Sequence, residues 1–170
     1  MPNQSAQPSL FASSAPASHA DSGWITAHCD GGARGNPGPA GFGAVVQDSE
    51  GKVLAELSEF LGIQTNNFAE YSGLLAVLDF ALKHRHPRLR VVSDSELMVK
   101  QIQGAYKVKS PGLKPLYDEA RKRIAGLEAF EITHALRHKN KDADRLANQA
   151  MDRGMGRAGV PTANAYARTR

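Results

Sequence analysis

The period of the hydrophobic pattern changes near residue 65, and this change constrains the fold more than any other feature of the chain. Before it come three alternating, β-rich segments: residues 24–30, 41–48 and 53–62. The second and third flank the sequence SEGK, which is typical of a hairpin turn. After it, Leu74, Leu78 and Leu82 recur every four residues and predict a long amphipathic helix. We therefore expect three antiparallel strands followed by a helix.

The second half of the chain alternates between strands and helices. Its predicted elements are a buried strand over 88–94, a helix over 95–104 closed by Gly104, a helix over 110–127 capped by Ser110, a strand over 130–137 and a helix over 141–154. The order β-β-β-α-β-α-(α)-β-α predicts an α/β protein with one mixed sheet and helices packed on it.

Composition sets the limits of the folded domain. Residues 1–23 are rich in Ser, Ala and Pro and contain no Lys or Arg, so we expect a disordered leader and not a secretion signal. After Asp152 the chain carries four arginines and no acid, which predicts a flexible basic tail over 155–170. The folded domain, of soluble globular composition, is expected over 24–154.

The net charge, hydropathy and cysteine content indicate the kind of binding partner and the cellular compartment. The formal net charge of +4 fits a polyanion such as nucleic acid, although the excess is small. No apolar run approaches the roughly 18 residues that a membrane span needs, so we expect no membrane association. Cys29 is the only cysteine, which excludes an intrachain disulfide and favours the reducing cytoplasm.

Four acidic residues fall at the ends of predicted elements. Asp30 ends the first strand, Glu70 lies in the first turn of the long helix, Asp94 ends the fourth strand, and Asp144 lies in the first turn of the last helix. Each has an ordinary structural explanation, because acids are common in turns, in caps and at the positive ends of helix dipoles. The spacing alone leaves open whether the four meet.

If these acids do meet, their chemistry indicates a metal site. Clustered carboxylates repel one another strongly unless a cation lies between them. Hard oxygen ligands without a cysteine or a histidine pair favour Mg²⁺ or Mn²⁺ over zinc. A pair of such ions suits the in-line attack of water on a phosphodiester.

Four sequence blocks resemble ribonuclease H type 1, in the order and spacing of that family. They are CDGGARGNPGPAGFGAVV, TNNFAEYSGLLAVL, VVSDSELMVKQI and RHKNKDADRLANQAM, and together they cover residues 24–153. The resemblance implies a five-stranded sheet in the order 3-2-1-4-5 with the first three strands antiparallel. It also implies hydrolysis of the RNA strand of an RNA–DNA hybrid, leaving 5′-phosphate and 3′-hydroxyl ends.

The resemblance also implies roles for individual residues. Asp30, Glu70, Asp94 and Asp144 match the ligands of two Mg²⁺ or Mn²⁺ ions, with Asp30 bridging both. The residues expected to bind the hybrid are Gly31, Asn36, Thr65, Asn66, Asn67, Ser95, Lys107 and Lys109. Amide and main-chain groups can contact the 2′-hydroxyls of the wide minor groove, and Thr65, Asn66 and Asn67 are equally typical helix caps.

The chain departs from the longer bacterial form of the family in three places. The sequence GAYKVKSPGLKP replaces a long basic, Trp-rich insertion, so the chain resembles the compact branch of archaeal and some bacterial members. Where the longer form has a histidine that assists proton transfer or product release, this chain has Arg137, with His138 adjacent as a substitute. Glu96 stands where the longer form often has a glutamine that reads a base edge.

Three alternative functions can be tested against the sequence. A phosphate-cradling nucleotide loop is excluded, because GGARGNPG lacks the Lys-Ser/Thr pair and is not followed by a helix. A binding module that kept the fold without the chemistry is disfavoured by the four acids. A nuclease acting on double-stranded RNA or RNA–DNA junctions stays open. We expect a monomer.

Overall fold

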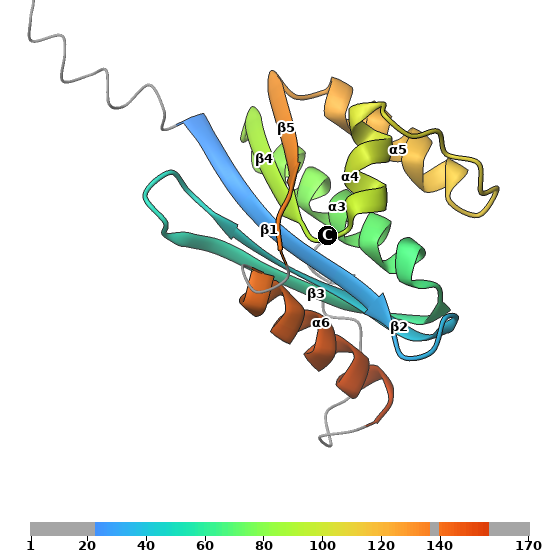
Figure 1. Cartoon of the computed structure of the whole chain (residues 1–170). Helices are drawn as coiled ribbons and strands as arrows, with labels where there is room; N and C mark the ends of the chain where they lie inside the picture. The colour runs from blue at the N-terminus through green and yellow to red at the C-terminus, as the bar shows by residue number, and fades with distance from the viewer. Residues whose placement is uncertain (1–22, 137–139, 157–170) are drawn as a thin grey trace, which may run out of the picture.

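The computed structural model describes residues 23–136 and 140–156. Along the chain its elements are β1 (Trp24–Ala33), β2 (Gly38–Gln47), β3 (Val53–Gln64), α3 (Asn66–Lys83), β4 (Arg88–Ser93), α4 (Glu96–Gln103), α5 (Lys114–Ala125), β5 (Ala129–His134) and α6 (Lys141–Gly154) (Figure 1). This order confirms the predicted succession of strands and helices. The leader over 1–23 and the tail over 155–170 lie outside the described residues except at their inner ends.

The five strands form one mixed sheet in the order β3-β2-β1-β4-β5. β2 pairs antiparallel with both β1 and β3, whereas β4 runs parallel to β1 and β5 runs parallel to β4. The order 3-2-1-4-5 is therefore confirmed. β1 is the central strand, so its residues contact elements from both halves of the chain.

Helices cover the two faces of the sheet unequally. Figure 1 shows α3, α4 and α5 on one face and α6 on the other, where it packs on β1, β2 and β3. The alternation of β1 explains this division, since Ile25, Ala27 and Cys29 are buried in the core beneath α3 while the intervening side chains face the α6 side. Leu74 and Leu78, from the four-residue repeat, are fully buried in the same core.

β1 continues three residues beyond its predicted end at residue 30. Gly31, Gly32 and Ala33 pair with residues of β2, so the glycines extend the ladder instead of ending it. The turn follows at 34–37, where Gly35 adopts a φ of 95° that favours glycine. Asp30 is therefore a residue of the strand itself and does not start a turn.

One helix start, the turn that holds Glu70 and one strand end also differ from the predictions. The carbonyl oxygen of Ser110 accepts hydrogen bonds from the N–H groups of Leu113 and Lys114, so residues 110–113 form a turn and α5 begins only at Lys114. Because α3 begins at Asn66, Glu70 lies in its second turn and not its first. β5 ends at His134, whose partner is Ser93, the last residue of β4.

The predicted cap of α3 is confirmed, and α4 begins with a cap of the same kind. The Thr65 hydroxyl accepts from the N–H of Phe68 at 3.1 Å, and the Ser95 hydroxyl accepts from the N–H of Met98 at 3.2 Å. Gly104 ends α4 in the left-handed conformation, with a φ of 89°. Among the described residues, no helix has the length and apolar character needed to cross a membrane.

Candidate active site

A close approach between β1 and α3 builds one side of the site. A Cβ atom on Gly31 would lie 2.5 Å from the carbonyl carbon and oxygen of Ala69 and 2.7 Å from the nitrogen of Glu70. Only glycine fits there, because all three neighbours are backbone atoms that cannot rotate away. This contact places the second turn of α3 directly beside Asp30.

Three carboxylates meet at this place. Asp30 from β1, Glu70 from α3 and Asp94 from the junction of β4 and α4 each offer an oxygen, and these oxygens lie within 4.8 Å of one another. Asp30 is 3% exposed and Glu70 is 9% exposed. At separations up to this limit, two ionised carboxylates repel each other by at least about 3.5 kcal/mol for an effective dielectric constant of about 20. A divalent cation would relieve this repulsion, and the donor set consists entirely of oxygen.

The negative field of the three acids extends to Cys29, the neighbour of Asp30 on β1. Burial raises the pKa of the Cys29 thiol well above its usual range, and the charges of Glu70, Asp30 and Asp94 raise this pKa further. The thiol is fully buried in the core. Cys29 is therefore a protonated core residue and not a candidate nucleophile.

Asp144 reaches the same place from the other face of the sheet. It lies in the first turn of α6 and, with Asp30 and Glu70, lines a pocket of about 380 Å³. It is not part of the cluster whose oxygens lie within 4.8 Å. The structure thus brings all four predicted acids to one region and draws three of them into a tight group.

Small residues and one buried amide fix the start of α6 against β1 and β2. A Cβ atom on Gly43, the β2 partner of Asp30, would collide with Ala143, Leu146 and Ala147 of α6. The Asn140 side chain, 1% exposed, donates from Nδ2 to the carbonyl oxygen of Cys29 at 2.7 Å. Sequence reasoning missed Asn140 because its partner lies 111 residues away.

The asparagines expected to bind the hybrid join the 34–37 turn to the start of α3. Asn36 Oδ1 accepts from the N–H of Asn66 at 3.0 Å, and Asn66 Oδ1 accepts from the N–H of Ala33 at 2.7 Å. Thr65, Asn66 and Asn67 are exposed beside them, whereas Gly31 is buried in the lining of the pocket. Of this rim of residues, Gly31 and Asn66 line the pocket together with Asp30 and Glu70.

The other predicted site residues are more dispersed. Ser95 follows Asp94 directly and caps α4. Lys107 and Lys109 are exposed in the segment between α4 and α5 and do not line the carboxylate pocket. Arg137 and His138 lie outside the described residues. Two residues not singled out in the sequence, Arg34 and Asn148, line the pocket with Asp144, and the four-residue spacing from Asp144 to Asn148 was the available signal.

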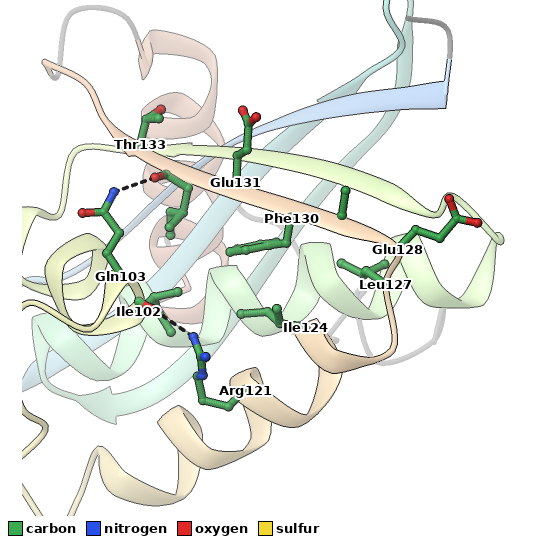
Figure 2. A pocket seen from close by; sticks show the side chains of 11 residues that line it. Ile102, Gln103, Arg121, Ile124, Leu127, Glu128, Phe130, Glu131 and Thr133 are labelled. Atoms are coloured by element: carbon green, nitrogen blue, oxygen red, sulfur yellow. Dashed lines mark hydrogen bonds between the residues drawn. The ribbon is translucent and has the colours of Figure 1, made fainter. Parts of the chain in front are cut away.

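A second cavity lies at the β5 edge of the sheet. It has a volume of about 590 Å³ and lies between β5, the end of α4 and α5, with Ile102, Ile124 and Phe130 among its apolar lining (Figure 2). Gln103 Nε2 donates to the carbonyl oxygen of Ile132 at 2.9 Å, and Arg121 Nη1 donates to that of Ile102 at 2.9 Å. None of the predicted site residues lines this cavity, so we place the chemistry at the carboxylates.

The sheet order and the carboxylates at the central strand define a ribonuclease H-like domain. Residues 28–150 match the family model described as reverse transcriptase-like. The N-terminal RNase H domain of a Mycobacterium tuberculosis protein, solved as a fusion with maltose-binding protein, is 44% identical with a TM-score of 0.75, over 78% of this chain and 96% of that one. The chain belongs to the ribonuclease H family.

Two further relatives are of type 1. LC11-RNase H1, solved in complex with an RNA/DNA hybrid, is 40% identical with a TM-score of 0.73, over 77% of this chain and 99% of that one. Ribonuclease HI of Halobacterium salinarum is 39% identical over 76% of this chain and 65% of its own length. The chain spans about a third (35%) of the length of the mycobacterial proteins that it matches at 46% identity.

Proposed function

We propose that the chain is a metal-dependent endoribonuclease that hydrolyses the RNA strand of RNA–DNA hybrids and leaves 5′-phosphate and 3′-hydroxyl ends. The observation that carries this proposal is the group of three carboxylates from β1, α3 and the β4–α4 junction, with oxygens within 4.8 Å. The hybrid in the solved complex of LC11-RNase H1 supports the choice of substrate.

The donor set fits hard divalent cations. Asp30, Glu70 and Asp94 supply only carboxylate oxygens, and Asp144 faces the same pocket, so these four residues would hold two Mg²⁺ or Mn²⁺ ions. Bound ions would activate the attacking water and stabilise the charge on the departing 3′-oxygen. The near-complete burial of Asp30 and Glu70 keeps both carboxylates in place before substrate arrives.

The rim beside the acids would bind the hybrid. Because the Oδ1 atoms of Asn36 and Asn66 accept backbone N–H groups, the Nδ2 group of each amide is the part that can donate to a phosphate or a 2′-hydroxyl. Gly31, Thr65, Asn67 and Ser95 would contribute to the same surface. Contacts of this kind read groove shape and not base identity, so we expect cleavage with little sequence preference.

Basic residues outside the pocket would add affinity for the phosphate backbone. Lys107 and Lys109 are exposed and would contact the DNA or RNA strand at a distance from the scissile bond. Arg137, with His138 as its substitute, is our candidate for assisting proton transfer or product release. We further propose a monomer that acts in the cytoplasm, where a buried, unpaired cysteine such as Cys29 is stable.

A substrate comparison tests the proposed function. The full chain is incubated with end-labelled RNA–DNA hybrid, double-stranded RNA, an RNA–DNA junction and single-stranded RNA, each with Mg²⁺, Mn²⁺ or a chelator. We expect cutting of the hybrid with metal and none with chelator. Cutting that persists in chelator, or hybrid left intact with both metals, would refute the metal-dependent reading, and preference for double-stranded RNA or junctions would reassign the substrate.

A further inference from the structure

The side chain of Arg34 joins the end of β1 to α6. Its Nη1 donates to Asp152 Oδ1 at 2.6 Å, and its Nη2 donates to Asn148 Oδ1 at 3.0 Å and to the Asn148 carbonyl oxygen at 3.4 Å. The Arg34 side chain is 28% exposed and its partner Asp152 is 38% exposed. The guanidinium is thus held on two sides by neighbouring turns of one helix.

Asn148 also contacts Asp144. The Nδ2 group of Asn148 donates to the Asp144 carbonyl oxygen at 3.0 Å and to Asp144 Oδ2 at 3.4 Å. Arg34 has only donors, so it fixes the amide with Oδ1 toward the guanidinium and Nδ2 toward the Asp144 carboxylate. A flipped amide would set N–H groups against the guanidinium and an oxygen against the carboxylate.

All three residues face the pocket that holds two of the clustered acids. Arg34, Asn148 and Asp144 line it together with Asp30 and Glu70. Arg34 forms its ion pair with Asp152, and its other terminal nitrogen donates to Asn148, which in turn contacts Asp144. Asn148 is thus the side chain that connects Arg34 to the Asp144 carboxylate.

We propose that Arg34 and Asn148 are positioning residues that hold the Asp144 carboxylate toward Asp30 and thereby raise the affinity of the site for its metal ions. Asp144 needs such support because it is the predicted ligand outside the tight carboxylate cluster. That Asp144 is a metal ligand is part of the proposed function, so this proposal rests on it. Groups that orient a metal ligand typically change metal affinity 10- to 100-fold when they are removed.

A double-mutant cycle on metal binding tests the chain of contacts from Arg34 through Asn148 to Asp144, which we call the relay. Binding of Mn²⁺ to the full chain is measured by isothermal titration calorimetry for the wild type, Arg34→Met, Asn148→Ala and the double variant. We expect each single variant to bind Mn²⁺ about tenfold more weakly. The double variant should bind Mn²⁺ no more weakly than Asn148→Ala alone, because both changes act through the side-chain amide of Asn148.

Asp152→Asn is the matched control. It removes the ion pair of Arg34 but leaves the contact between Arg34 and Asn148, so its Mn²⁺ affinity should stay within about twofold of the wild type, as expected for the loss of a partly exposed ion pair. Loss of affinity in Asp152→Asn equal to that in Arg34→Met would mean that Arg34 only ties the turn to the helix, and would overturn the proposal. Thermal melts of all four variants report any loss of fold.

Cleavage of the RNA–DNA hybrid provides a second test. For Arg34→Met, we expect kcat to fall at low metal concentration and to recover at high metal concentration, while KM for the hybrid is unchanged. Wild-type affinity in Arg34→Met would overturn the relay and leave the proposed function intact. Absence of Mn²⁺ binding by the wild type would overturn the proposed function and the relay together.

Discussion

Replacing Gly31 with alanine tests whether the close approach of β1 and α3 builds the site. The added Cβ would lie 2.5 Å from the Ala69 carbonyl and 2.7 Å from the Glu70 nitrogen. Reaching ordinary contact requires α3 to move by roughly 1 Å, and forced overpacking of this kind costs about 1–3 kcal/mol. Since the displaced backbone carries Glu70, we expect activity to fall by up to about 100-fold, as for a 1 Å misplacement of a catalytic group.

Urea unfolding and initial rates of hybrid cleavage measure the two effects of Gly31→Ala separately. Two glycines serve as controls. A Cβ on Gly32 would approach Asn66 Oδ1 no closer than 3.7 Å, and a Cβ on Gly73 in α3 would meet Phe42 at 3.4 Å and Cys29 at 3.6 Å. Gly73→Ala should stabilise the protein by up to about 1 kcal/mol through helix propensity. If Gly31→Ala had the same free energy of unfolding as Gly32→Ala and cleaved the hybrid at the wild-type rate, the close approach of β1 and α3 would not be what builds the site.

Three further predictions concern single residues of β1. Asp30→Asn should abolish cleavage while gel-shift binding of the hybrid persists; retained cleavage would show that Asp30 is only a structural residue of the strand. The Cys29 thiol, whose pKa is raised by burial and by the nearby acids, should react with a disulfide reagent at pH 8 only after unfolding, and rapid reaction of the folded protein would contradict this. Burial lowers the pKa of His28 below 6.5, although the charge of Asp142 opposes this shift. The unfolded state therefore binds more protons than the folded state, and the free energy of unfolding should decrease as the pH falls below about 6.5. In urea titrations at several pH values, His28→Gln should make this decrease smaller.

The sequence predicted those features that depend on local patterns. The succession of strands and helices, the cap at Thr65 and the places of the four acids at element ends follow from periodicity and residue type, whereas the strand order 3-2-1-4-5 and the meeting of the acids were implied by the resemblance to ribonuclease H. It predicted the end of β1 wrongly, because the pairing of Gly31 with Phe42 outweighs the turn preference of glycine. It also placed the start of α5 wrongly, because a turn at Ser110 satisfies the same backbone groups as a cap.

Long-range polar contacts were beyond prediction from one sequence. Asn140 reaches Cys29 across 111 residues, and Arg34 reaches Asn148 across 114 and Asp152 across 118. Such contacts depend on where α6 lies on the sheet, which no local pattern encodes. The contact of Arg34 with Asn148 also links Asp144 to the end of β1, so this part of the geometry around the fourth acid had to come from the structure.

The position of α6 divides the carboxylates between two pieces of polypeptide. Asp30, Glu70 and Asp94 belong to the sheet and the helices on one face, whereas Asp144 arrives on α6, which packs against β1, β2 and β3 from the other face. Cutting the chain between residues 136 and 140 would therefore separate three acids from the fourth. Under the proposed function, the piece that lacks α6 would hold three of the four metal-binding acids, and an added α6 peptide would supply the fourth.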